Sequence, residues 1–332
     1  MLSVSVIIPT HNRASLLANA IDSVACQTYA PHELIIVDDG SSEDIKATVL
    51  CAADRAGRAG FPIRYIRQEQ VGAPAARNTG VAAATGDWIA FLDSDDRWLP
   101  EKLELQVRAL QHFAGRSEAC VTDATYVNNP ELQKSAFQQT GTRCSETIGI
   151  FPEILKQVAY GYHGIYLQAL VVRRQLIVDI GGFDPSLQLG EDTDLIFQIA
   201  NRTSICYVNS PLVMIDRTPN RADGLIELAR NERFGFEMSV LLYERWLRRY
   251  PQLDPEILKR VLWRLQEVHT GLSSVHLIAG DYAKARKSLT EALRYRFTPR
   301  AAFKWLLTAV TPGIARLAVL KRRAKTSERA LF

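Results

Sequence analysis

The feature that most constrains the fold is a regular alternation of short β-branched runs and helical patterns along the first 113 residues. We expect strands at 4–8, 33–37, 63–66 and 88–92, each followed by a helix, at 15–27, 43–55, 74–84 and 100–113. Repeated strand–helix units of this length predict an α/β fold, with a mostly parallel, Rossmann-like sheet and helices on both faces. Ligand loops of such a sheet lie at the carboxyl ends of its strands.

The pattern changes after the first strand–helix units. The further expectations are a strand at 119–126, a long loop or small insertion up to 149, a helix at 151–160, an apolar run at 165–172, a short helix from Glu191, and two strands at 205–208 and 212–215. From about residue 224 only helical periodicity remains. We therefore place a domain boundary near residue 220, between an α/β domain (1–220) and an all-helical domain (221–332).

Composition narrows the class of protein. At 47% hydrophobic and 23% charged residues over 332 positions, the chain is neither disordered nor fibrous. Its five scattered cysteines include no C-x-x-C pair, so a reducing, cytoplasmic location is expected. The apolar start runs into Thr10-His-Asn-Arg without a basic segment and predicts a strand, not a signal peptide. The stretch 301–320 is broken by charged residues and Pro312, which makes it a poor membrane span.

Charge is unevenly distributed along the chain. The segment 294–332 holds ten Lys and Arg residues and one Glu, a net +9, and since the whole chain is +4, the first 293 residues carry −5. Aromatic and leucine residues are interleaved with these basic residues, and a break is expected at Thr311-Pro-Gly. A basic amphipathic end of this kind fits peripheral contact with an anionic membrane. The alternatives are packing within the chain or a homodimer; nucleic acid is disfavoured because no recognition module accompanies the tail.

The most informative motif is Asp93-Ser-Asp-Asp, which follows the apolar run 88–92. Three carboxylates this close repel one another unless a cation lies between them, so Asp93 and Asp95 suit Mg²⁺ or Mn²⁺, completed by phosphate oxygens and water. The alternative is that these residues cap the helix expected from residue 100. Capping explains one aspartate, not three.

Two other acidic pairs allow two interpretations each. Asp38-Asp39 follows a strand, and Asp39 can accept a hydrogen bond from a base or ribose, although the same pair is also a common acidic turn. Glu191-Asp192 falls in the first turn of the expected helix, where the helix dipole favours anionic side chains. The functional alternative is that one of these carboxylates is a general base.

Three arginines are candidates for anion binding. Arg77 lies near an expected helix start, and Arg217 and Arg221 flank a Thr-Pro-Asn turn from which they can reach a diphosphate. Each can equally be a surface arginine. The histidines show no metal-binding spacing, so no metal is assigned to them.

Taken in order, several segments are similar to the motifs of the family 2 glycosyltransferases. They are VSVIIPTHNR (4–13), IVDDGSS (36–42), ARNTG (76–80), IAFLDSDD (89–96), GGFD (181–184) and GEDTDL (190–195). The resemblance covers about residues 3–217. It implies a GT-A fold, a nucleotide-sugar donor, a divalent metal and inversion at the anomeric carbon.

The resemblance also implies roles for particular residues. Pro9, Thr10, Asp39 and Arg77 fall where the family holds the nucleotide. Asp93 and Asp95 match its D-x-D motif, with Asp95 the direct metal ligand. Asp192 matches the catalytic base, with Glu191 beside it. No Q-x-x-R-W motif follows, which disfavours a processive polymerase.

The sequence therefore predicts a metal-dependent, inverting enzyme that transfers one sugar. We expect the donor to be a UDP-sugar and the acceptor a hydroxyl of a glycan or lipid-linked acceptor in bacterial surface-polysaccharide synthesis. Arg217 and Arg221 would assist the metal with the diphosphate. Two alternatives stay open: a nucleotidyltransferase that uses the same metal site, and a non-catalytic nucleotide- or sugar-binding module.

Overall fold

The computed structural model describes residues 1–56, 60–161, 164–218 and 231–329. The chain forms two compact units, Met1–Arg221 and Ala222–Phe332, called here the sheet unit and the helical unit. Each unit is described by itself.

The first part of the sheet unit follows the predicted alternation closely. Its elements are β1 (Val4–Thr10), α1 (Ala14–Ala25), β2 (Glu33–Asp39), α2 (Ile45–Ala56), β3 (Ile63–Gln68), α3 (Ala73–Ala83), β4 (Trp88–Phe91), β5 (Arg97–Trp98) and α4 (Lys102–His112). Every residue of β1 and β2 is buried, as expected for parallel strands covered on both faces.

The second part of the sheet unit is less regular. Its elements are β6 (Ser117–Val127), α5 (Ala136–Thr140), β7 (Ile148–Ile150), α6 (Ile154–Tyr160), a 3₁₀ turn (Leu167–Ala169), β8 (Leu170–Arg173), α7 (Arg174–Asp179), α8 (Glu191–Ala200) and β9 (Ser204–Asp216). The expected helix from Glu191 is present as α8.

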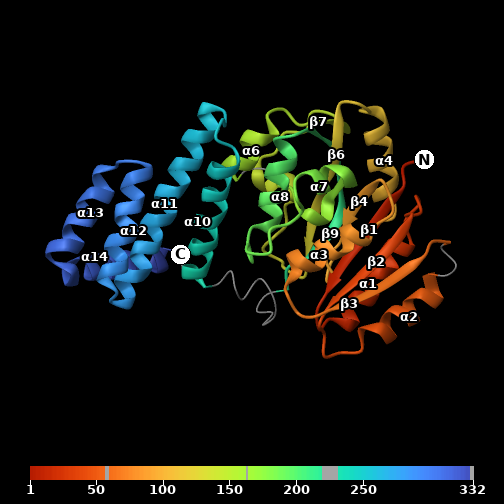
Figure 1. Ribbon diagram of the computed structural model, residues 1–332, viewed down its shortest axis with the longest axis horizontal. Coiled ribbons are helices and arrows are strands. Elements are labelled where there is room, and N and C mark those ends of the chain that lie inside the picture. Colours follow the sequence, from red (N-terminus) through yellow and green to blue (C-terminus); the bar gives the residue numbers. More distant parts are fainter. Residues whose placement is uncertain (57–59, 162–163, 219–230, 330–332) are drawn as a thin grey trace. The chain divides into compact units, whose positions relative to one another are not determined.

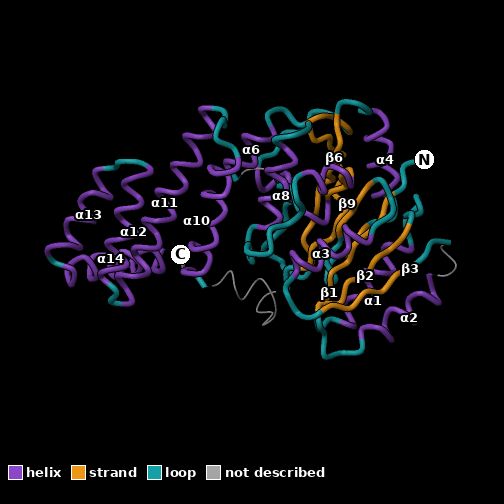
Figure 2. The backbone as a smooth tube through the Cα atoms, viewed as in Figure 1, coloured by secondary structure: helices purple, strands orange, loops and turns teal. Residues whose placement is uncertain are grey.

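All described strands belong to one nine-stranded sheet of order β3-β2-β1-β4-β8-β6-β9-β5, with β7 also paired to β9 (Figure 2). β1 runs parallel to β2 and β4, β2 to β3, and β6 to β9, whereas β8 is antiparallel to both β4 and β6. β5 and β7 are antiparallel to β9, so six strands point one way and three the other. The predicted mostly parallel sheet is confirmed, and its antiparallel strands are β5, β7 and β8.

Helices cover both faces of this sheet (Figure 1). Val4, Val6 and Ile8 pack in one hydrophobic cluster with buried residues of α1, α2 and α4. Ile7 faces the opposite way and lies under α3, where a Cβ on Gly80 would come within 2.4 Å of the Ile7 Cγ2. A glycine at this position therefore lets α3 approach β1 closely.

Two local expectations are wrong. The runs 205–208 and 212–215 were expected as two strands, but both lie in the single strand β9, because register shifts around Asp123 let β6 pair along its whole length. The segment 128–149, expected as a loop or insertion, holds the short helix α5 and the start of β7. Ser135 and Gln138 form a capping box at the start of α5.

The helical unit contains five described helices: α10 (Glu232–Arg249), α11 (Pro255–Ala279), α12 (Tyr282–Tyr295), α13 (Pro299–Val310) and α14 (Pro312–Arg329). Side chains of Asn231, Asp254, Asp281 and Thr298 accept hydrogen bonds from backbone N–H groups at the starts of the first four. The break expected at Thr311 is present. Among the described residues, no helix combines the length and apolar character needed to cross a bilayer.

Candidate active site

Parallel pairing brings the ends of β1, β2 and β4 to one edge of the sheet. Thr10, the last residue of β1, pairs with Asp38 near the end of β2, and Ile7 pairs with Phe91 at the end of β4. Because each strand is followed directly by polar residues, these polar segments meet at the carboxyl edge, as the sequence predicts for a ligand site.

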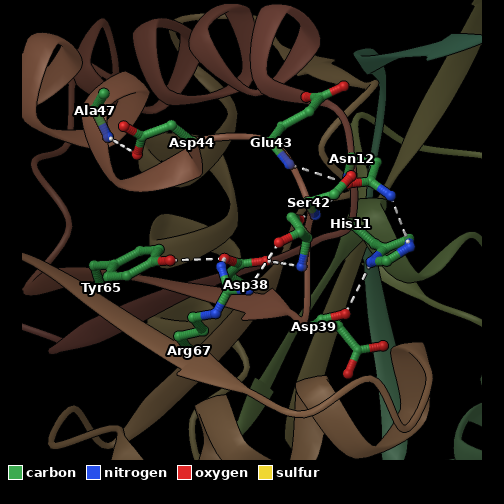
Figure 3. Close-up of polar contacts among 11 residues, drawn as sticks. His11, Asn12, Asp38, Asp39, Ser42, Glu43, Asp44, Ala47, Tyr65 and Arg67 are labelled. Atoms are coloured by element: carbon green, nitrogen blue, oxygen red, sulfur yellow. Dashed lines mark hydrogen bonds and ion pairs between the residues drawn. The ribbon is translucent and has the colours of Figure 1, made fainter.

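The turn after β2 is neutralised by its own surroundings (Figure 3). The Asp38 carboxylate accepts hydrogen bonds from the Ser41 backbone N–H (2.9 Å), the Tyr65 hydroxyl (2.6 Å) and the Arg67 guanidinium (3.0 Å). These donors outweigh the effect of burial and lower the pKa of Asp38. Asp38 thus anchors the turn to β3.

Asp39 holds the loop between β3 and α3. Its carboxylate accepts from the Gln68 side-chain amide (2.8 Å) and from the backbone N–H groups of Val71 (3.0 Å) and Gly72 (2.8 Å). Gly40 has a φ of +74°, and a Cβ there would lie 2.8 Å from the Gln70 backbone nitrogen. The turn therefore needs glycine at this position.

The loop after β1 is tied to the same turn (Figure 3). The Asn12 side-chain oxygen accepts from the Ser42 backbone N–H at 2.7 Å, and a ring nitrogen of His11 lies 2.8 Å from the Asp39 carbonyl oxygen. Beside these residues, the buried Thr10 hydroxyl has no hydrogen-bond partner among the described atoms. Pro9 pairs with Val37 inside the sheet.

The turn after β4 is connected to α8 through Arg77. One terminal nitrogen of the Arg77 guanidinium donates to Glu191 at 2.8 Å and the other to Asp93 at 2.9 Å. Arg77 is 3% exposed and Glu191 4%, so this bridge is buried. The two carboxylates raise the pKa of Arg77 against the effect of burial and keep it charged. Arg77 therefore joins two acidic motifs that are far apart in the sequence.

A second connection runs through Gln168, which lies in the 3₁₀ turn before β8. Its side-chain amide nitrogen donates to Asp93 (2.6 Å) and to Asp96 (2.7 Å), and the Gln168 backbone carbonyl oxygen accepts from the Trp98 indole N–H (2.9 Å). Asp96 also accepts from the Asp216 backbone N–H at 2.8 Å. The end of β9 is thereby linked to the acidic turn.

Asp95 lies in the same turn and is partly exposed. Its carboxylate pairs with the Arg13 guanidinium at 2.8 Å, and its side chain is 16% exposed. Asp93 is 27% exposed at its side chain, and Asp96 is buried. Thus Asp93 and Asp95 reach the surface of the turn, whereas Asp96 supports it from inside.

Two acids in this region have raised pKa values. Burial, with the neighbouring charges of Asp93 and Asp95, raises the pKa of Asp96 well above its ordinary value. Burial and the adjacent Asp192 raise the pKa of Glu191 to about 7, although Arg77 opposes the shift. Burial and neighbouring carboxylates therefore disfavour the ionised forms of Asp96 and Glu191.

The other predicted residues lie as follows. Asp192 is half-buried in the first turn of α8, where its carboxylate accepts from the Thr193 backbone N–H at 2.6 Å. The Arg217 guanidinium lies 5.7 Å from the centre of the Tyr166 ring. Arg221 lies outside the described residues.

The structure brings Arg77, Asp93 and Glu191 into direct contact but pairs Asp95 with Arg13, a residue that the sequence did not single out. Gln168 was also missed, and no motif marks it. Arg13 directly follows Thr10-His-Asn at the end of β1, so its place at the sheet edge was the available signal. Within the described ranges, no group of three or more His, Cys, Asp or Glu side chains is arranged to hold a metal.

The model of the family described as Glycosyl transferase family 2 matches residues 5–180, more than half of the chain. The chain belongs to glycosyl transferase family 2. The predicted family is thereby confirmed. Glu191, Asp192 and Arg217 lie beyond the matched segment.

Several curated relatives match part of the chain. A Nostoc glycosyltransferase of uncharacterised function is 42% identical over 184 residues, 55% of each chain. A Rickettsia felis relative is 31% identical over 210 residues, 63% of this chain but only 32% of its own length. The Escherichia coli protein WfgD, named UDP-Glc:alpha-D-GlcNAc-diphosphoundecaprenol beta-1,3-glucosyltransferase, is 42% identical over 105 residues, 31% of this chain and 39% of that protein.

Solved structures share the fold. TarS 1–349 from S. aureus, in complex with UDP-GlcNAc, aligns with a TM-score of 0.70 at 16% identity and covers 98% of this chain and 92% of that chain. The mannosyltransferase PcManGT from Pyrobaculum calidifontis, in complex with GDP-Man and Mn²⁺, aligns with a TM-score of 0.57 at 20% identity, covering 99% and 84%. The predicted GT-A type of α/β fold followed by helices is confirmed.

Proposed function

We propose that this family 2 chain transfers one sugar from a nucleotide diphosphate sugar to an acceptor hydroxyl, with inversion at the anomeric carbon. The observation that carries the proposal is the buried Arg77 bridge, which holds Glu191 beside Asp93. A metal-binding turn and a carboxylate base are the two elements that this reaction needs, and Arg77 links the segments that supply them.

Asp192 is the proposed base. The acceptor hydroxyl is a weak nucleophile, so the Asp192 carboxylate would take its proton as the oxygen attacks the anomeric carbon from the face opposite the diphosphate. This in-line attack forms the new glycosidic bond, breaks the bond to the diphosphate and inverts the configuration. Glu191 would position Asp192 through its contact with Arg77.

The donor set fits a divalent metal. Mg²⁺ and Mn²⁺ prefer oxygen ligands, and such ions are commonly held by one or two carboxylates together with substrate phosphates. Asp93 and Asp95, the two carboxylates at the surface of the turn, would hold the ion. When bound, it would neutralise charge on the leaving diphosphate. Asp95 would exchange part of its pairing with Arg13 for this role.

For the donor nucleotide we propose UDP, since WfgD, which is 42% identical over 105 residues, is named for a UDP-sugar donor. Pro9, Thr10, Asp39 and Arg77 would form the nucleotide end of the site. The buried Thr10 hydroxyl supports this placement, because a buried polar atom without a partner is suited to a ligand contact. Arg217 and Arg221 would contact the diphosphate.

We propose a lipid-linked acceptor, reached at an anionic membrane surface. α13 and α14 expose Phe303, Leu306, Val310, Ile314 and Leu317, and basic residues lie among them. Each basic residue near an anionic surface contributes about 1 kcal/mol. Co-sedimentation with phosphatidylglycerol vesicles, compared with neutral phosphatidylcholine vesicles, tests this contact.

The decisive experiment compares Asp192→Asn with a matched control, Asp179→Asn, at an exposed site in the same unit. Loss of the base should lower the rate of sugar transfer by about a hundredfold or more, while the affinity for UDP in the presence of Mn²⁺ stays unchanged. The control should match the wild type in both measurements. Retention of most of the transfer rate by Asp192→Asn would refute the proposed base.

The same assay separates the alternatives. UDP, GDP, dTDP and CMP are tested for binding with and without Mn²⁺, and products are identified by mass. A nucleotidyltransferase would release inorganic diphosphate and tolerate Asp192→Asn. A binding module would bind a nucleotide and transfer nothing.

A further inference from the structure

The helical unit contains a pocket of about 670 Å³ that the reaction proposed above does not use. Its walls come from α10, α11, α13, α14 and the segment before α13 (Figure 1). All of its lining residues belong to the helical unit. The pocket therefore exists within one compact unit.

Much of the wall is apolar. Phe236, Trp263, Phe303, Leu307 and Val319 line it. The Phe236 ring lies against Gly271, where a Cβ would come within 2.5 Å of the ring. A glycine in α11 thus makes room for an aromatic side chain in the wall. Such a surface favours a hydrocarbon ligand.

Cationic side chains line the same pocket. They are Arg296, Arg300, Lys304, Arg322 and Arg323, against two carboxylates, Glu232 and Glu267. Both carboxylates already form ion pairs, Glu232 with Arg323 and Glu267 with Arg264. The lining therefore has an excess of positive charge, which attracts an anion.

Lys304 adds a second reason to expect an anion. Its ammonium group donates to the Thr270 carbonyl oxygen (3.0 Å), the Ser273 hydroxyl (2.8 Å) and the Ser274 hydroxyl (2.6 Å), all of which are neutral. Burial lowers the pKa of Lys304 to about 8. These neutral partners orient the ammonium group without balancing its charge, and a nearby phosphate would do so.

We propose that this pocket binds a lipid diphosphate, with the hydrocarbon chain on the aromatic wall and the diphosphate on the arginines and Lys304. This proposal rests on the function proposed above: the pocket would bind the lipid anchor of the acceptor. A hydrocarbon chain explains the apolar wall, and a diphosphate explains the excess of cations. Neither half of this ligand alone accounts for both features.

The direct test is calorimetric titration with farnesyl diphosphate below its micelle concentration, in EDTA, which removes the metal that would hold a diphosphate in the donor site. Farnesol and inorganic diphosphate supply the two halves of the ligand. Farnesyl diphosphate should bind at one site, and each half should bind about tenfold more weakly or worse. Equal binding of inorganic diphosphate, or of farnesol, would overturn the proposal.

The matched variants are Arg296→Gln with Arg300→Gln, two exposed residues of the lining, and Arg286→Gln with Lys287→Gln, two exposed residues on α12 outside it. Both pairs remove two positive charges from the same unit. The first pair should weaken farnesyl diphosphate binding about tenfold, and the second should leave it unchanged. Equal effects of the two pairs would overturn the proposal in favour of general charge attraction.

Trp263→Phe provides a variant that keeps the charges. Quenching of tryptophan fluorescence by farnesyl diphosphate should be seen in the wild type and largely lost in this variant, while calorimetric affinity changes little. Quenching that persists unchanged would place the ligand elsewhere.

Kinetics distinguish this proposal from the function on which it rests. With a sugar-diphosphate lipid as acceptor, Arg296→Gln with Arg300→Gln should raise the acceptor KM about tenfold and leave kcat and the donor KM unchanged. With a soluble alkyl glycoside, the same variant should match the wild type. An unchanged acceptor KM would refute the pocket proposal alone. Absence of any transfer by the wild type would refute the proposed function, and the binding data would still decide the pocket.

Discussion

Two acidic turns at the same sheet edge, Asp38–Asp39 after β2 and Asp93–Asp96 after β4, look alike in sequence and differ in structure. The first is surrounded by donors from β3 and from the following loop, and the pKa of Asp38 is lowered. The second lies among other carboxylates, and the pKa of Asp96 is raised. Acidic residues at a strand end do not by themselves indicate a metal site. Negative charge beyond what the neighbouring donors balance is the more specific sign.

The largest expected effect is on the rate of sugar transfer, which should depend on the turn after β4 and not on Asp38. Asp95→Asn should lower sugar transfer by about a hundredfold or more, because the proposed metal loses a ligand. Its free energy of unfolding should change by less than about 1 kcal/mol, since its ion pair with Arg13 is partly exposed. Transfer rates over a Mn²⁺ titration, with Asp179→Asn as control, measure the effect. Full activity would leave the two turns functionally equivalent.

The free energy of unfolding should show the opposite order, with a larger loss for Asp38→Asn than for Asp95→Asn. Asp38→Asn removes the charge and replaces the oxygen that accepts from Tyr65 and Arg67 with an NH₂ group, so it should lower the free energy of unfolding by about 2 kcal/mol. Below the unfolding transition, its transfer rate should stay close to that of the wild type. Urea unfolding and the transfer assay test both statements. A folded Asp38→Asn protein as inactive as Asp95→Asn would break the comparison.

The pH dependence of the free energy of unfolding should show how Glu191, which Arg77 links to the turn after β4, differs from Asp38. The pKa of Glu191 is raised to about 7, so the folded chain binds this proton more tightly than the unfolded chain does. The contribution of Glu191 to stability is therefore greatest below about pH 4.5 and falls by about 3 kcal/mol as the pH rises from about 4.5 to about 7. Urea unfolding between about pH 5 and about pH 8 should show a shallower decline in Glu191→Gln than in the wild type. Identical slopes would contradict the raised pKa.

Glu33, in β2, lies away from the acidic turn that follows β4, and its pKa is shifted in the opposite direction to that of Glu191. Donors from Thr85, Ser5 and Arg64 lower its pKa to about 2 despite burial. Its contribution is full above about pH 4.5 and is lost as the pH falls toward about 2. A Glu33→Gln variant should therefore differ most from the wild type at neutral pH.

The smallest expected effect concerns one donor of the first turn. Tyr65→Phe removes the 2.6 Å hydrogen bond to Asp38 and should cost about 0.5–1 kcal/mol of unfolding free energy, with no change in transfer. Thermal denaturation and the transfer assay are sufficient to test it. A loss of transfer without a loss of stability would assign the turn a role in catalysis.

Much of the fold could be predicted because local patterns determine it. Apolar runs of four to seven residues separated by amphipathic segments identify β1 to β4 and their helices. Strand direction is not contained in such patterns, so the reversed sense of β8 could not be derived from its apolar residues. The continuity of β9 through Pro211 was missed because proline and polar residues usually end a strand, whereas here a register shift in the pairing with β6 accommodates them.

The candidate site divides in the same way. Asp93, Asp95, Glu191 and Asp192 stand in acidic motifs and were selected from sequence. Gln168 could not be selected from sequence, because an isolated glutamine belongs to no motif. It reaches Asp93, 75 positions away in the chain, only after β8 has paired with β4. The contacts that hold an acidic turn are long-range, and one sequence does not encode their partners as a local pattern.

The pairing of β6 with β9 also sets an order of assembly. β1 to β4 pair through contacts within the first 91 residues. In contrast, β6 pairs with residues almost 90 positions later, from Ser117 with Ser204 to Val127 with Asp216. Contacts between distant positions form late, since a long loop must close first, and chains fold from the N-terminus as they are synthesised. The turn of Asp38 can thus form early on the ribosome. The Asp216 contact that supports Asp96 forms only after β9 has emerged, so the acidic turn after β4 is completed later than the Asp38 turn.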